Sequence, residues 1–243
     1  MTKLDTPFDQ LDWAIIETQL NAEGYAVLAG CIETAQALSL GHELARAGEP
    51  VYRRRVALES LDLGRGELRY FGDALPAPLS AWRDALYRRL APIANRWSAK
   101  LGAPHRFAPH WGAFLDANLA AGQTQPQSNV SHLSAEDWQA LHQRDDGGEV
   151  FPFQAVAVLS EPQRDFTGGE FVMTERRPRM QSRPMVVPLR PGDLAIVATS
   201  LRPCEGAQGV YRVGLKHAIS RVRGGERIGL ELAFHHAPGV DAR

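Results

Sequence analysis

The chain has 243 residues, 44% of them hydrophobic, which is enough for one sizeable core in a single domain. Its formal net charge is −1, so no global electrostatic field draws it toward nucleic acid or an anionic membrane. The two cysteines, Cys31 and Cys204, lie far apart and outside any Cys-x-x-Cys pair, which argues against a disulfide framework or a zinc cluster.

The N-terminus favours a cytoplasmic location. Lys3, Asp9 and Asp12 stand where a signal peptide would need an apolar run. The longest apolar runs are short, such as residues 155–159, so no segment is predicted to span a membrane. We therefore expect a protein of the reducing cytoplasm with no membrane partner.

Residues 1–123 are predicted to be mainly helical. In chain order, apolar periodicity and end signals predict a helix over 9–21, a strand over 25–28, a helix over 33–47, a strand over 52–58 and a helix over 80–101. Pro92 should kink the last helix or divide it in two, because a proline ring removes one backbone hydrogen bond. Residues 105–121 are ambiguous, because Pro109 and Gly112 interrupt any helical pattern there.

Residues 124–243 change character and predict a β-core. Strand-like runs separated by turn signals cover 153–159, 169–174, 185–189, 193–199, 211–222 and 227–235. Short strands at this spacing are typical of a sandwich or barrel. No repeat, low-complexity segment or linker divides the chain. We therefore expect one α+β domain over 1–243, with a helical layer packed on the β-core.

Two histidines and an arginine around this core are candidates for a metal and co-substrate site. His142 comes just before the first predicted core strand, His217 lies inside the strand over 211–222, and Arg227 opens the last strand. Two histidines and a carboxylate on one face of a β-fold form the facial triad that binds non-haem Fe(II). A buried arginine nearby can clamp a carboxylate in a two-pronged contact. Spacing alone is weak evidence, because such histidines are more often structural and a strand-end arginine is usually solvated.

Several sequence blocks point to a family. Among them are Val150-Phe151-Pro152, Leu159-Ser160-Glu161-Pro162, Asp165-Phe166-Thr167-Gly168-Gly169-Glu170-Phe171, Tyr211-Arg212-Val213 and Phe234-His235. With these blocks the chain resembles a bacterial family of 2-oxoglutarate/Fe(II) oxygenases, whose members are labelled prolyl-hydroxylase-like or as acting on damaged, methylated DNA. The resemblance implies a double-stranded β-helix (jelly-roll) fold and a requirement for Fe(II), 2-oxoglutarate and O₂. It also implies that His217 is the distal iron ligand and that Arg227 pairs with 2-oxoglutarate.

The chain departs from this family at the carboxylate of the His-x-Asp motif. Two residues after His142 stands Arg144, and residues i and i+2 of an extended segment share a face. Arginine cannot be deprotonated and cannot ligate Fe(II). Three interpretations stay open: a one-residue slip that makes Asp145 the ligand with His142 and His217, weak binding through the two histidines with water or an anion, or an inactive site.

Other positions near the expected pocket differ as well. Tyrosines expected upstream of the proximal histidine appear as Leu133 and Trp138, and an expected arginine appears as His132. Leucine cannot donate a hydrogen bond to the co-substrate, whereas a phenol can. Several polar losses in one pocket favour drift or re-purposing.

The leading hypothesis is a 2-oxoglutarate- and Fe(II)-dependent dioxygenase that hydroxylates or demethylates an unidentified substrate. The alternative is a catalytically inactive protein that keeps the fold and serves as a binding or regulatory module. A cupin-type metal protein is disfavoured, because the Gly-rich strand with His-x-His is absent. Arginine clusters such as 53–55 leave nucleic acid open as a substrate, but a small molecule, amino acid or peptide is favoured because acidic residues balance the total charge.

Overall fold

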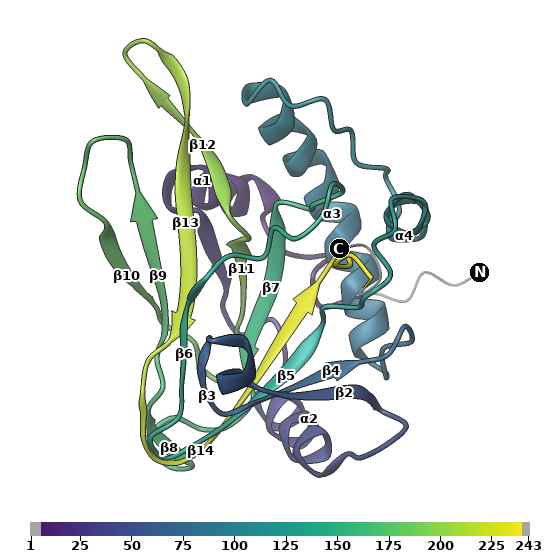
Figure 1. Cartoon of the computed structure of the whole chain (residues 1–243), viewed down its shortest axis with the longest axis vertical. Coiled ribbons are helices and arrows are strands. Elements are labelled where there is room, and N and C mark those ends of the chain that lie inside the picture. Colours follow the sequence, from purple (N-terminus) through teal and green to yellow (C-terminus); the bar gives the residue numbers. More distant parts are fainter. Residues whose placement is uncertain (1–5, 240–243) are drawn as a thin grey trace.

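Two antiparallel β-sheets face each other in the computed structural model, and helices cover the outer side of the larger one (Figure 1). The structure describes residues 6–239, so Lys3 of the charged N-terminus lies outside the described residues. The helices are α1 (Trp13–Glu23), α2 (Thr34–Arg46), α3 (Leu79–Lys100) and α4 (Trp111–Ala120), with a short 3-10 helix over Leu58–Leu61. No helix within residues 6–239 is long and apolar enough to cross a membrane.

The larger sheet has the strand order β1-β11-β7-β14-β5-β4-β2, with β8 paired to β14. Its strands are β1 (Tyr25–Leu28), β2 (Tyr52–Ala57), β4 (Glu67–Phe71), β5 (Asn129–Ser134), β7 (Phe153–Val158), β8 (Phe166–Gly168), β11 (Leu194–Ala198) and β14 (Val222–Ala233). Strand β7 is buried along its whole length, because one face meets the helices and the other meets the smaller sheet. Because successive side chains of β7 point to opposite faces of the sheet, Phe153 contacts Trp97 of α3 and Gln154 contacts His217.

The smaller sheet has the order β10-β9-β13-β6-β3, with β12 paired to β13. Its strands are β3 (Gly64–Arg65), β6 (Trp138–His142), β9 (Phe171–Arg176), β10 (Arg183–Val187), β12 (Leu201–Gly206) and β13 (Gly209–Ile219). The ladder between β13 and β6 has a register irregularity between His217 and Ile219. On the near side of this irregularity, His217 and His142 are direct partners in the ladder.

A cluster of aromatic rings joins the helices to the larger sheet. Phe151, at the entry to β7, is fully buried, and its ring centroid lies 4.9 Å from that of Tyr87 on α3, 5.0 Å from Phe107 and 5.1 Å from Phe234. Phe114 of α4 completes the contact at 5.7 Å. These edge and tilted contacts hold α3 and α4 against the sheet that forms one wall of the site.

The predicted helices over 9–21, 33–47 and 80–101 and strands over 25–28 and 52–58 are confirmed within a few residues. The helix over 80–101 is not divided at Pro92, since α3 runs unbroken through it. The ambiguous 105–121 segment contains α4. The N-terminal 123 residues also contribute β1, β2 and β4 to the larger sheet, so they supply more than a helical layer.

Truncating Phe151 tests the aromatic cluster. Phe151→Ala should lower the free energy of unfolding by about 3–5 kcal/mol, because it leaves a cavity where five rings meet. Leu119→Ala, an exposed position on α4, should cost less than about 0.5 kcal/mol. Urea unfolding followed by tryptophan fluorescence measures both values. Equal costs at the two positions would contradict a core centred on Phe151.

Candidate metal and co-substrate site

The smaller sheet brings together two histidines that are far apart in sequence. His142 ends β6 and His217 lies on β13, and the two residues are direct partners in the ladder between these strands. Their ring centroids are 4.2 Å apart, and both residues are buried. The sequence-predicted pair of imidazoles is therefore assembled on the face that looks toward the larger sheet.

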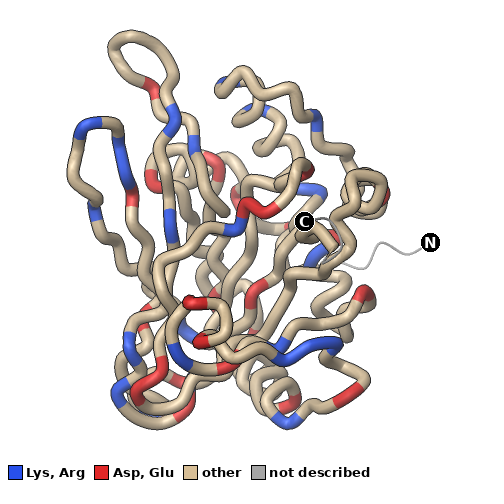
Figure 2. The backbone as a smooth tube through the Cα atoms, in the orientation of Figure 1, with Lys and Arg blue, Asp and Glu red and all other residues tan. Residues whose placement is uncertain are grey.

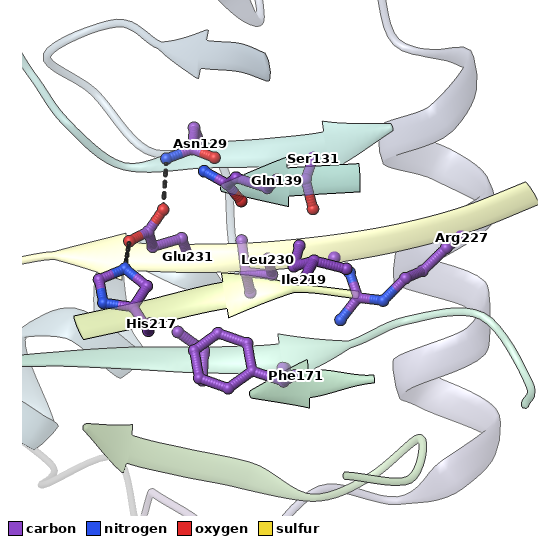
Figure 3. Close-up of a pocket in the computed structure, with 12 residues that line it drawn as sticks. Asn129, Ser131, Gln139, Phe171, His217, Ile219, Arg227, Leu230 and Glu231 are labelled. Carbon is purple, nitrogen blue, oxygen red and sulfur yellow. Dashed lines mark hydrogen bonds and ion pairs between the residues drawn. The ribbon is translucent and has the colours of Figure 1, made fainter. Parts of the chain in front are cut away.

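A carboxylate reaches this pair from the opposite sheet. On β14, alternation points Arg227, Gly229 and Glu231 to the interior of the two-sheet core. The Glu231 Oε1 atom lies 3.6 Å from His217 Nε2, and Oε2 accepts a hydrogen bond of 2.9 Å from Asn129 Nδ2 (Figure 3). Ligand atoms of His142, His217 and Glu231 all lie within 4.8 Å of one another. Two imidazoles and one carboxylate thus meet in a single small region.

Arg144 binds the same carboxylate. Its Nε donates to Glu231 Oε1 at 3.2 Å and its Nη2 donates to Oε2 at 2.8 Å, in a bidentate pair that is largely buried. The backbone of Arg144 is fixed by a hydrogen bond from its N–H to Thr199 O. His142 and residue 144 do share a face, as the i and i+2 spacing predicts. The guanidinium therefore lies at the edge of the metal site.

The structure does not bring Asp145 into this region. Asp145 is exposed, has no regular secondary structure, and is not among the residues that share the small region with His142 and His217. Asp146, Gly147 and Gly148, which follow it, are exposed as well. A carboxylate ligand from this segment would require a backbone rearrangement that the described structure does not contain.

Burial controls the charge states around the metal position. Burial lowers the pKa of His142 to about 3, and the nearby charges of His217 and Arg144 act in the same direction, so its imidazole is neutral. With a proton on Nδ1, His142 donates to Ala140 O at 2.9 Å, which leaves Nε2 for a metal. Burial alone would raise the pKa of Glu231, but Arg144 and His217 hold it well below its usual value. The carboxylate is therefore ionised.

Arg227 lies farther along β14 and is 2% exposed. Its Nε donates to Gly169 O at 2.8 Å, whereas its buried Nη1 has no hydrogen-bond partner among the described residues. A Cβ at Gly229 would lie 2.5 Å from this Nη1, so the absence of a side chain there makes room for the guanidinium. Burial lowers the pKa of Arg227 to about 10, which leaves it charged at neutral pH.

A narrow cavity connects the two halves of the site. It is lined by His217 and Glu231 at one end and by Arg227 at the other, with Gln139, Phe171 and Leu230 between them (Figure 3). The donor set at the first end is the one that non-haem Fe(II) uses. The unpartnered Nη1 at the second end suits a carboxylate. The residues present therefore fit both a divalent metal and an acidic co-substrate.

Glu231 is the site residue that the sequence analysis missed. Its signal was available, because it is the one charged residue in the apolar run 228–233 and lies four residues after Arg227, on the same face of the strand. Neither altered position upstream of His142 adds a polar group to the site: Leu133 is fully buried, whereas Trp138 is exposed on the outer face.

Breaking the buried pair should destabilise the protein. Glu231→Gln should lower the free energy of unfolding by about 3–5 kcal/mol, because it leaves the guanidinium of Arg144 buried without its counter-charge. The double variant Arg144→Gln/Glu231→Gln should recover most of this loss. Arg96→Gln, which removes an exposed bidentate pair with Glu17, should cost less than about 1 kcal/mol. Additive costs at positions 144 and 231 in chemical denaturation would contradict the coupling.

The same carboxylate should give a pH-dependent stability difference. The folded pKa of Glu231 is depressed, so its contribution is present above the unfolded pKa of about 4.3 and is lost as the pH falls toward the folded value. The gap in unfolding free energy between wild type and Glu231→Gln should therefore be full at pH 7 and shrink below about pH 4.3. Denaturation series at several pH values measure this gap, and a constant gap down to pH 3 would contradict an ionised Glu231.

Solved structures share the fold. The chain matches a Pseudomonas putida prolyl-4-hydroxylase with a TM-score of 0.54 at 12% identity, covering 94% of this chain and 100% of that chain. An oxidoreductase of the 2OG-Fe(II) oxygenase family from Burkholderia pseudomallei gives 0.53 at 18% identity, with 95% and 94% covered. A Trichoplax adhaerens prolyl hydroxylase, in complex with a peptide fragment of hypoxia inducible factor, gives 0.53 at 12% identity, with 91% and 87% covered.

Sequence comparisons place the chain more closely. Uncharacterized proteins from two strains of Mycobacterium tuberculosis are each 40% identical to it over 200 residues, which cover 79% of this chain and 84% of each relative. A family model described as an oxygenase catalysing oxidative methylation of damaged DNA matches residues 66–237, a span that includes His142, His217, Arg227 and Glu231. Because this match covers well over half of the sequence, the chain belongs to that oxygenase family.

Proposed function

We propose that the protein is a 2-oxoglutarate- and Fe(II)-dependent dioxygenase with a double-stranded β-helix (jelly-roll) core, which hydroxylates or demethylates a substrate not yet identified. One observation carries the proposal: His217 and Glu231, with His142 beside them, lie at one end of a cavity whose other end holds a buried guanidinium with a free donor. Membership of an oxygenase family and likeness to 2-oxoglutarate oxygenase folds support it.

In this proposal His142, His217 and Glu231 hold the iron. Glu231 replaces Asp145 as the carboxylate, because Asp145 is exposed and Glu231 already lies beside His217. Arg227 holds the far carboxylate of 2-oxoglutarate. When bound, iron with 2-oxoglutarate and O₂ supplies oxidation of a substrate C–H bond, coupled to conversion of 2-oxoglutarate to succinate and CO₂.

The remaining work of the site falls to the protein. The Ala140 carbonyl orients His142 through its Nδ1. The Gln154 amide contacts His217 Nε2, the ring nitrogen that faces Glu231, at 3.0 Å. The Phe171 ring stacks on His217, with 5.8 Å between centroids and 12° between planes, and closes one wall of the cavity. Buried apolar walls exclude water from the reacting centre and strengthen the pairing of Arg227 with an anion.

The substrate class favoured by the charge pattern is a small molecule, an amino acid or a peptide. Acidic and basic residues are interspersed along the chain, with a short basic stretch at Arg53–Arg54–Arg55 on the edge strand β2 (Figure 2). Part of this stretch is engaged, because Arg53 pairs with Asp73 and Arg54 stacks over Tyr70. A similar fold does bind a peptide in the Trichoplax adhaerens protein.

A second function is favoured by one specific contact. The bidentate pair between Arg144 and Glu231 satisfies the carboxylate without any metal. A protein that keeps this pair permanently would retain the fold as a catalytically inactive binding or regulatory module. The two functions differ in whether Fe(II) and 2-oxoglutarate bind together.

Anaerobic titration with Fe(II) and 2-oxoglutarate tests the proposal. The wild type should develop the weak visible charge-transfer band of the bound pair and release succinate when O₂ is admitted. Arg227→Met should weaken 2-oxoglutarate binding at least about tenfold while metal binding persists, because one buried charge-assisted bidentate contact is lost. Arg223→Met, an exposed arginine on the same strand, serves as the matched control. A folded protein with no band and no succinate would favour the binding module.

A further inference from the structure

We propose that Arg144 is a displaceable counter-ion that competes with the metal for Glu231 and thereby sets the metal affinity of the site. This inference rests on the proposed function, since it takes His142, His217 and Glu231 as the metal ligands. It assigns to Arg144 the role of a positioning residue whose removal strengthens metal binding.

Arg144 and Asn129 already occupy most of the Glu231 carboxylate. Arg144 donates to both oxygens of Glu231, and Asn129 donates to Oε2 in addition. A carboxylate offers about four lone-pair directions, and these contacts already use three of them. The direction that is left belongs to Oε1, which Arg144 Nε also contacts. A metal placed there with the two imidazoles would share the carboxylate with the guanidinium, so the two cations would compete for one negative charge.

The positive charge of Arg144 also opposes a metal ion at this position. Arg144 and Glu231 neutralise each other inside the protein, and the guanidinium cannot release its proton to relieve a clash of charges. Burial disfavours the charged form of Arg144, but Glu231 and Tyr70 more than offset this and raise its pKa above the usual range. A dication at the triad would meet this fixed positive charge across a low-dielectric space. The repulsion weakens metal binding unless Arg144 moves away.

Other carboxylates follow Arg144 directly in the chain. Arg144 is itself buried, but residues 145–148 after it are exposed and have no regular secondary structure. Asp145 and Asp146 form no ion pair within residues 6–239, so they offer alternative carboxylates to a guanidinium that leaves Glu231.

The experiment measures Co(II) affinity by calorimetry on chelator-stripped full-length protein, without 2-oxoglutarate. Arg144→Gln should bind Co(II) at least about tenfold more tightly than wild type, because the carboxylate is freed and a positive charge is removed. Arg144→Lys keeps the charge but cannot make the bidentate contact, so its Co(II) affinity should lie between those of the wild type and Arg144→Gln. It also provides a second test if the glutamine variant fails to fold. Arg202→Gln, which breaks the buried pair with Glu175 away from the site, should leave the affinity unchanged.

The outcomes separate this inference from the function on which it rests. Tighter Co(II) binding by the Arg144 variants than by the wild type supports the inference. If the variants bind Co(II) and the wild type binds none at all, the inference is still supported, but the dioxygenase function of the natural protein is contradicted. Equal or weaker binding by the variants, with a wild type that binds, overturns the inference and leaves the function in place. Absence of binding in every folded variant overturns both.

Discussion

The carboxylate of Glu231 lies between the guanidinium of Arg144 and the imidazoles of His142 and His217. Whether it pairs with Arg144 or with a metal held by the imidazoles would decide the chemistry of the site. An ionised carboxylate this deep in a protein needs a counter-charge, because desolvation otherwise drives it to the neutral acid. Arg144 supplies the charge in the described structure. A divalent metal would supply it more strongly and would use the imidazoles as well. The site is therefore built around one negative charge with two possible cations.

The two-sheet architecture explains how such a site arises. The histidines come from β6 and β13 of the smaller sheet, while Glu231 and Arg227 come from β14 of the larger sheet. Strand alternation turns all four side chains toward the space between the sheets. The helices cover the far face of the larger sheet through the rings around Phe151. This packing fixes β7 and β14 and, with them, one wall of the cavity.

Much of the architecture could be predicted from the sequence, because long helices and apolar strands have a clear periodicity. The strands β5 and β6 escaped prediction because Asn129, Ser131 and Gln139, which line the cavity, interrupt their apolar pattern. His142, His217 and Arg227 were found through family blocks, and spacing alone would not have selected them. Glu231 was missed because the family places the carboxylate beside the first histidine, and a lone charge in an apolar strand does not by itself indicate a contact with the opposite sheet.

The most direct test of the account is anomalous diffraction from crystals soaked in Co(II) under anaerobic conditions. The account predicts one strong peak bonded to His142, His217 and Glu231, with the Arg144 guanidinium turned away from the carboxylate. Crystals that show no peak among these three residues at saturating Co(II), with Arg144 still paired with Glu231, would contradict the account.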